Sequence, residues 1–117
     1  MAVRRKQDSG ITVLTVSGEF YGDSETDVLE AALQKELADG TLKLVLDLSE
    51  CGMMNSNALR VMVNAKKAYD AKGGAIRLCG VDRRMKRLLE VVHLYDWFDH
   101  HDTEEQAVAA FSKPEQV

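Results

Sequence analysis

Cysteine, proline and long apolar runs are all scarce in this sequence of 117 residues. Its two cysteines, Cys51 and Cys79, form no CxxC motif, which excludes a disulfide framework and favours a reducing, cytoplasmic environment. No segment approaches the ~20 apolar residues that a membrane-spanning helix needs, so we expect no membrane insertion. No apolar stretch follows the basic start, which excludes a secretory signal. The single proline, Pro114, falls in residues 112–117, which we predict to be a flexible tail.

Positive charge is outnumbered, with 15 lysines and arginines against 19 acidic residues. The net charge of −4 and the pI near 5.3 argue against nucleic-acid binding, because proteins hold a phosphate backbone through an excess of positive side chains. The nucleotide-binding motifs GxxxxGK[ST] and GxGxxG are both absent, so we expect no bound nucleotide and no other cofactor.

No catalytic set of residues is evident in the sequence. Ser56 has no histidine placed to activate it, and Asp47 and Glu50 form no evident acid–base pair. His100 and His101 are adjacent, so on an extended chain they point to opposite sides and chelate a metal poorly. We predict a solvated loop for this pair, and we predict a binding module rather than an enzyme.

Hydrophobic periodicity predicts one compact α/β domain, because the chain is long enough for one core and leaves no length for a second. Strand and helix patterns alternate after residue 24, as in parallel crossover units, whereas the first two strands form an antiparallel hairpin with a turn at 8–10. We therefore predict a mixed β-sheet covered by about four helices. The predicted strands are 1–10, 11–20, 43–49, 75–81 and a short piece around Trp97 and Phe98. Along 43–49, we expect Leu44, Leu46 and Leu48 on one face of the strand and Val45 and Asp47 on the other. The predicted helices begin at a cap formed by Asp23 or Ser24, at Ser56, at a cap formed by Asp82, and at a capping box formed by residues 103–106, which starts with Thr103.

The segment LDLSECGMMNSNALRVMV (46–63) passes from a strand into a helix. In open α/β sheets, ligands and partners gather beyond the carboxyl ends of the strands, where we expect the loop 49–56. The free N–H groups and the dipole of a helix start favour negative charge at that place. Ser56 then has two compatible interpretations: a helix cap worth about 1 kcal/mol, or an accessible hydroxyl that carries a phosphate.

The residues around this junction form the partner-binding surface that we expect. Adaptable methionine side chains either pack inward or line such a docking surface. The residues predicted to contact a partner are Glu19, Tyr21, Met53, Met54, Asn55, Ser56, Asn57 and Arg60. A second cluster is basic and is either a solvated helix face or a contact for an acidic partner; it consists of Arg83, Arg84, Lys86 and Arg87.

Three stretches together resemble STAS domains, and more specifically the single-domain bacterial anti-sigma factor antagonists. They are VSGEF (16–20), LVLDLSECGMMNSNALRVMV (44–63) and KGGAIRLCGVDRRMKRLLEVVHLYDWFDHHDTEEQAVAAF (72–111). No single stretch is diagnostic, but their order and spacing are fairly specific. The resemblance covers about residues 10–111 and implies an STAS-like mixed sheet in one domain.

The resemblance also implies a function. In such antagonists, the unmodified protein binds an anti-sigma factor, which is often also a serine kinase, and so frees the sigma factor for transcription. The kinase phosphorylates a serine at the junction, the complex dissociates, and a PP2C-like phosphatase resets the cycle. The matching position in this sequence is Ser56.

Three positions at the junction depart from the family pattern. Asn55 stands where an acidic residue is common, Asn57 replaces the usual Ser or Thr, and Ala58 replaces the usual Gly. Asn55 keeps the hydrogen-bonding shape but loses a charge. The two asparagines favour an alternative function, a STAS adaptor that is not phosphorylated and serves as a subunit of a signalling or lipid-transport complex.

Overall fold

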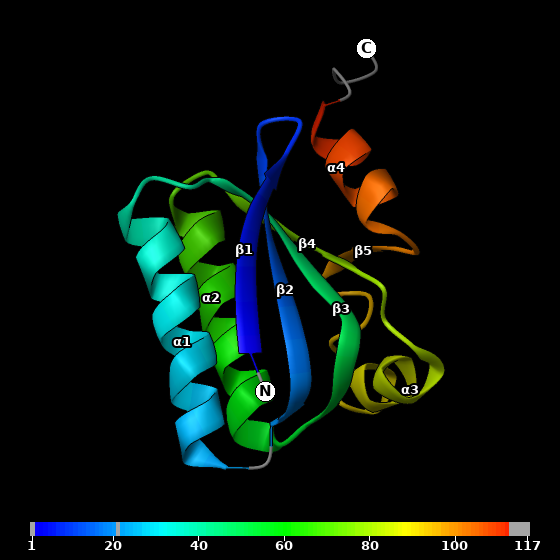
Figure 1. Cartoon of the computed structure of the whole chain (residues 1–117). Coiled ribbons are helices and arrows are strands. Elements are labelled where there is room, and N and C mark those ends of the chain that lie inside the picture. The colour runs from blue at the N-terminus through cyan, green and yellow to red at the C-terminus, as the bar shows by residue number, and fades with distance from the viewer. Residues whose placement is uncertain (1, 21, 113–117) are drawn as a thin grey trace.

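The computed structural model describes residues 2–20 and 22–112 of the chain. These residues form a five-stranded sheet in the order β1-β2-β3-β4-β5, together with four helices (Figure 1). In chain order the elements are β1 (Ala2–Asp8), β2 (Ile11–Phe20), α1 (Asp23–Ala38), β3 (Lys43–Met54), α2 (Ser56–Ala71), β4 (Ala75–Cys79), α3 (Arg83–Val91), β5 (Asp99–His101) and α4 (Glu104–Ser112).

The sheet is mixed, which confirms the predicted fold class. β1 pairs antiparallel with β2 through a turn at Ser9 and Gly10, and both turn residues take the left-handed conformation, with φ of 54° and 82°. The other neighbouring strands are parallel to one another. Each parallel connection contains a helix, as crossover units require.

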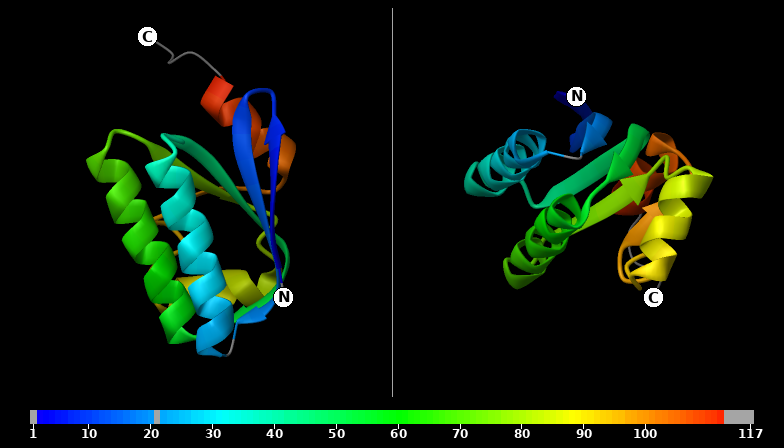
Figure 2. Two further views of the ribbon diagram at one scale, coloured as in Figure 1. Left: turned by 60° about the vertical axis from the view of Figure 1, so that its left-hand side comes forward. Right: turned by 90° about the horizontal axis from the view of Figure 1, so that it is seen from below.

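Helices cover both faces of the sheet (Figures 1 and 2). α1 and α2 lie side by side on one face, while α4 lies against the opposite face. Two apolar clusters result. The larger includes Leu46 of β3, Met62 of α2 and Met85 of α3, and the smaller joins Val45 of β3 to Ala107 of α4.

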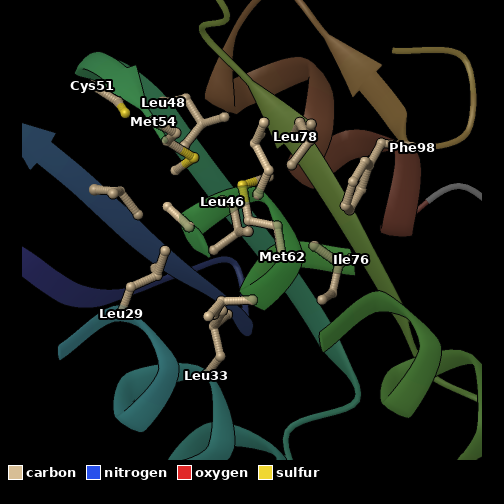
Figure 3. Close-up of a cluster of buried hydrophobic side chains, with 14 of the residues drawn as sticks. Leu29, Leu33, Leu46, Leu48, Cys51, Met54, Met62, Ile76, Leu78 and Phe98 are labelled. Atoms are coloured by element: carbon tan, nitrogen blue, oxygen red, sulfur yellow. The ribbon is translucent and has the colours of Figure 1, made fainter. Parts of the chain in front are cut away.

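The predicted alternation of side chains along β3 is confirmed. Leu44, Leu46 and Leu48 are at most 1% exposed and belong to the larger cluster, whereas Val45 belongs to the smaller one. Figure 3 shows Leu46 and Leu48 among side chains from the neighbouring elements. The central strand is therefore buried on both faces, which fixes its register and the place where it ends.

β3 is longer than we predicted, since it spans Lys43–Met54 rather than 43–49. β2 continues to Phe20, and two register shifts between the strands let it stay paired with the second half of β3. A local sequence pattern does not reveal this pairing, because the partner strand lies far away in the sequence. The predicted loop 49–56 is thereby reduced to one residue between the elements, Asn55.

The last strand begins just after the extended piece that we predicted around Trp97 and Phe98. Trp97 lies in a turn and Phe98 in a bend, and β5 starts at Asp99. Phe98 is 1% exposed and fills the larger cluster, so its apolar character reflects burial rather than strand formation.

The prediction of a solvated loop for His100 and His101 is wrong. Both histidines are half-buried in β5, because this strand pairs with β4 at the edge of the sheet. The ring of His100 stacks on Tyr95 with a centroid distance of 3.9 Å. The Nε2 atom of His101 lies 3.2 Å from a guanidinium nitrogen of Arg77, and burial together with this guanidinium lowers the pKa of His101.

The start of α1 differs from the prediction that Asp23 or Ser24 caps it. The N-cap residue is Gly22, and among the residues that the structure describes no side-chain bond caps this helix. The Ser24 hydroxyl instead donates to the carboxylate of Glu25 at 2.9 Å, and this bond lowers the pKa of Glu25.

The caps that we predicted for the last two helices are confirmed. The Asp82 carboxylate accepts from the backbone N–H of Met85 at 2.8 Å. Thr103 and Gln106 form the capping box, in which the Thr103 hydroxyl accepts from the backbone N–H of Gln106 at 3.1 Å. α4 extends through Ser112, and the remaining part of the predicted tail, 113–117, lies outside the described residues.

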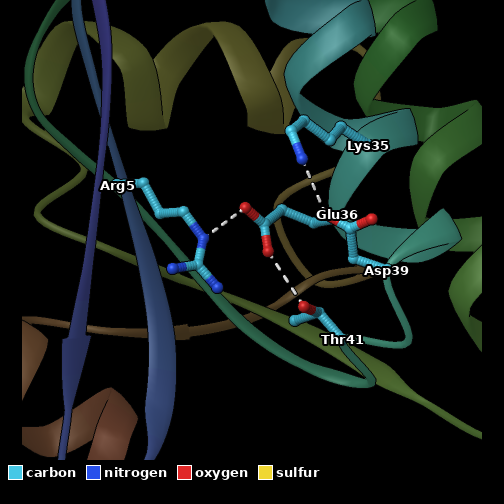
Figure 4. Close-up of polar contacts among 5 residues, drawn as sticks. All are labelled: Arg5, Lys35, Glu36, Asp39 and Thr41. Atoms are coloured by element: carbon cyan, nitrogen blue, oxygen red, sulfur yellow. Dashed lines mark hydrogen bonds and ion pairs between the residues drawn. The ribbon is translucent and has the colours of Figure 1, made fainter.

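A buried carboxylate ties the edge strand β1 to α1 (Figure 4). Glu36 is 4% exposed, accepts from Arg5 Nε at 2.6 Å and accepts from the Thr41 hydroxyl at 2.9 Å. Because a buried charge is costly without partners, these two bonds offset the cost of burying Glu36 between β1 and α1. The neighbouring pair Lys35–Asp39 is exposed and contributes little.

Candidate functional site

The junction between β3 and α2 is held by Asn55. Its backbone is extended, with φ of −81° and ψ of 177°, and its N–H donates to the carbonyl of Phe20 at 2.9 Å. Its side-chain Oδ1 accepts from the backbone N–H of Ala58 at 2.9 Å, which satisfies one of the free N–H groups of the first helical turn. Asn55 is therefore the N-cap of α2.

Ser56 is the first helical residue of α2 and is exposed. The first interpretation of Ser56, a helix cap, is therefore not met, because Asn55 caps the helix. The Ser56 hydroxyl takes no part in the bond between Asn55 and Ala58. The first turn of α2 holds no acidic side chain, and the positive end of the helix dipole favours an added anion there.

Replacing Asn55 by alanine is expected to lower the free energy of unfolding by about 1 kcal/mol, because it removes the oxygen that accepts from Ala58. Asn55→Asp keeps that oxygen and is expected to retain the wild-type stability. Ser56→Ala is the matched control and should stay within about 0.5 kcal/mol of wild type. Urea denaturation followed by circular dichroism measures all three, and a larger loss for Ser56→Ala than for Asn55→Ala would assign the cap to the serine.

The ends of β2 and β3 lie beside this helix start. Glu19 pairs with Met53, and Phe20 pairs with Met54. Glu19 is exposed and lies over Gly52, where an added Cβ would sit 3.1 Å from the carboxylate of Glu19. Met53 is half-buried at the surface, but Met54 is 3% exposed and packs in the larger cluster (Figure 3). Met54 thus does not belong to the exposed partner surface that we expected, because the longer β3 turns its side chain inward.

A side-chain bond that we did not predict joins two residues of the predicted surface. Arg60 donates from a terminal guanidinium nitrogen to Asn57 Oδ1 at 2.7 Å. Their spacing of three residues on a helix was the signal available in the sequence. Tyr21, also predicted to contact a partner, lies outside the described residues. The predicted residues that the structure places together at this end of the sheet are Glu19, Met53, Asn55, Ser56, Asn57 and Arg60.

The basic cluster of α3 lies on an exposed helix face. Its four side chains form no ion pair with any residue in 2–20 or 22–112. The Lys86 ammonium lies 5.4 Å from the ring centroid of Tyr95. Both interpretations of this cluster, a solvated face and a contact for an acidic partner, are compatible with this geometry.

The two cysteines are buried in different clusters, Cys51 in the larger and Cys79 in the smaller. Burial raises the pKa of Cys51 to about 11 and that of Cys79 to about 12. Both thiols are thus protonated at neutral pH, and since the thiolate is the reactive form, they act as small apolar core residues.

The described residues form neither a membrane-spanning helix nor a metal-binding cluster. None of their helices combines the length and the apolar character needed to cross a bilayer. No three or more of their histidine, cysteine, aspartate and glutamate side chains are grouped so that they could hold a metal ion.

The fold and the site define a small α/β domain with a mixed five-stranded sheet, in which the polar residues Asn55, Ser56, Asn57 and Arg60 lie where β3 passes into α2. The chain belongs to the STAS domain family, whose model matches residues 2–107. This match confirms the family that the sequence stretches resembled.

Individual relatives agree with the family assignment. The chain is 24% identical over 111 residues to an anti-sigma F factor antagonist from Paenibacillus polymyxa, with 92% of each protein covered. Its fold is similar to that of an anti-sigma factor antagonist from Mycobacterium paratuberculosis, with 23% identity, a TM-score of 0.82, and 96% of this chain and 94% of that chain covered. The fold is also similar to that of the anti-sigma factor antagonist SpoIIAA in its unphosphorylated form, with 15% identity, a TM-score of 0.77, and 97% of this chain and 100% of that chain covered. For the phosphorylated form of SpoIIAA from Bacillus, the identity is 16% and the TM-score is 0.73, with 94% of this chain and 99% of that chain covered. At these identities the structural likeness establishes the fold.

Proposed function

We propose that this protein is an anti-sigma factor antagonist. It binds an anti-sigma factor that is also a serine kinase while Ser56 is unmodified, and phosphorylation of Ser56 releases it. In this cycle the bound anti-sigma factor cannot hold its sigma factor, and a PP2C-like phosphatase returns the antagonist to its binding state. The family, the name of the Paenibacillus relative and the fold of SpoIIAA support this role in the cytoplasm.

The observation that carries the proposal is the division of roles between Asn55 and Ser56. Asn55 caps α2 through its bond to Ala58, and Ser56 is exposed at the first helical position. The hydroxyl is therefore accessible to a kinase, and its modification does not remove a bond that holds the helix. The N-terminal end of a helix also stabilises a negative charge.

The kinase step is a phosphoryl transfer from ATP. A bond forms between Ser56 Oγ and the γ-phosphorus, the bond from that phosphorus to the bridging oxygen of ADP breaks, and the hydroxyl proton passes to a base of the kinase. The product carries a charge of roughly −1.5 to −2 and three acceptor oxygens. This charge lies on the surface beside Asn57 and Arg60, so it acts on a docked partner rather than on the core.

Incubation with the cognate kinase and ATP tests the proposal. The wild-type protein is expected to gain one phosphate, and Ser56→Ala is expected to gain none, as measured by intact-protein mass spectrometry. Ser49→Ala is the matched control, because Ser49 is an exposed serine on β3 outside the helix start. Equal phosphorylation of wild type and Ser56→Ala would remove Ser56 from the mechanism.

A second candidate function is a STAS adaptor that is not phosphorylated and that docks constitutively in a signalling or lipid-transport complex. The amides of Asn55 and Asn57 favour it, because they stand where the family more often has acidic and hydroxyl side chains. The same experiment separates the two. An adaptor would stay unmodified with every kinase tested, and its complexes would be indifferent to a charge at position 56.

A further inference from the structure

The guanidinium of Arg60 lies over the first turn of α2. One of its terminal nitrogens donates to Asn57 Oδ1 at 2.7 Å, across three residues of the helix. The side chain is exposed and forms no ion pair with any of the residues that the structure describes. A guanidinium carries five N–H donors, so this neutral contact with an amide leaves donors for a second acceptor.

Ser56 and Arg60 are four residues apart in the same helix, and such residues are neighbours on one face. Helical side chains tilt toward the N-terminus, and the bond to Asn57 demonstrates this direction for Arg60. An acid four residues before a base is also the favourable order of such a pair, because it agrees with the helix dipole.

We propose that Arg60 is the counter-ion of the phosphate on Ser56. Phosphorylation moves the guanidinium from the amide oxygen of Asn57 to the phosphate oxygens, where the hydrogen bonds are charge-assisted and stronger. The modification thus changes two side chains of the docking surface, because it adds a dianion and withdraws a cation that the unmodified surface offers to a partner. This inference rests on the proposed function only in taking Ser56 as the modified residue.

The other charged groups near this helix start do not replace Arg60. The first turn of α2 contains no acidic side chain that would compete for the guanidinium. Glu19 is the exposed acid on the neighbouring strand, where it lies over Gly52. The lysines of α2 are Lys66, which pairs with Asp70, and Lys67. Both lie about three helical turns beyond Ser56.

The test places phosphoserine at position 56 during translation, so no kinase is needed. Phosphorus NMR then measures the second pKa of the phosphate in the otherwise wild-type protein, in Arg60→Gln and in Lys67→Gln. Because Arg60 favours the dianion, Arg60→Gln is expected to raise this pKa by about 0.3 pH unit or more. Lys67→Gln removes the same charge about 16 Å along the helix, beyond the screening length, and is expected to leave the pKa unchanged. Glu19 is present in all three proteins, so its effect cancels in the comparison.

A second measurement checks the exchange directly. The side-chain N–H resonances of Arg60 and the amide resonances of Asn57 are expected to shift when phosphoserine replaces Ser56, as the bond between them is lost. Equal phosphate pKa values in wild type and Arg60→Gln, with unchanged Arg60 resonances, would overturn the inference. Failure of the proposed function would have a different signature. The phosphoserine placed during translation would still pair with Arg60, but the kinase would not modify Ser56 in the unmodified protein, or the phosphate would not change partner binding.

Discussion

Phosphoserine at position 56 is expected to weaken binding to the anti-sigma factor by about 100-fold or more, which corresponds to about 2.8 kcal/mol. Ser56 is exposed at the start of α2 and is one of the residues of the predicted partner surface. A partner that covers it must remove the phosphate and the guanidinium of Arg60 from water, and the desolvation of charged groups costs several kcal/mol per ion. The expected loss of affinity is therefore well within what a single phosphate can supply.

The domain itself is expected to stay folded after this modification. The cap bond from Asn55 to Ala58 does not involve Ser56, and the opposite side of α2 is anchored in the core by residues such as Met62 and Tyr69, which are at most 1% exposed. The far-ultraviolet circular dichroism of phosphorylated protein should match that of wild type. A loss of helix signal on phosphorylation would contradict the mechanism, because the partner would then be released by unfolding rather than by charge at the interface.

Isothermal titration calorimetry with the purified anti-sigma factor measures this effect. Ser56→Ala is expected to bind like wild type, and Ser56→Asp, which supplies a single charge, is expected to fall between wild type and phosphoserine. Asn64→Asp is the matched control, since it adds the same charge at an exposed position of α2 two turns further along. A similar loss for Asn64→Asp and Ser56→Asp would mean that net charge, rather than the surface at Ser56, controls binding.

The largest effect on stability is expected for Leu46→Ala, with a loss of about 2.7 to 5 kcal/mol in the free energy of unfolding. Leu46 is 1% exposed on the central strand β3, where it pairs with Leu14 of β2 and Leu78 of β4. Removing its side chain leaves a cavity in the larger cluster, which neighbours from three strands and the helices cannot fill without moving. A domain of this size is typically stable by about 5 to 15 kcal/mol, so the variant should be folded only marginally.

Urea denaturation monitored by tryptophan fluorescence and circular dichroism checks this prediction. Leu42→Ala is the matched control, because Leu42 is 41% exposed just before β3 and loses the same atoms. It is expected to change the free energy of unfolding by no more than about 0.5 kcal/mol. Similar losses for the two variants would show that the larger cluster does not dominate the stability of the domain.

Local patterns in the sequence predicted most of the fold. The alternation of Leu44, Val45 and Leu46 assigned the two faces of β3, and the caps at Asp82 and Thr103 located two helices, because both signals depend on residues close together in the chain. The order of the motifs also indicated the family correctly. Sequence spacing likewise placed the exposed serine at the start of a helix.

The sequence by itself determined the alternation of strands and helices, the mixed sheet and the position of Ser56 at a helix start. Only the tertiary structure decided that β3 runs on to Met54, that this side chain points inward, and that Asn55 rather than Ser56 caps α2. The physical reason is that these features depend on contacts between distant segments. The end of β2 gives the second half of β3 its hydrogen-bond partners and holds the backbone of Asn55 through Phe20, and no local pattern contains that pairing.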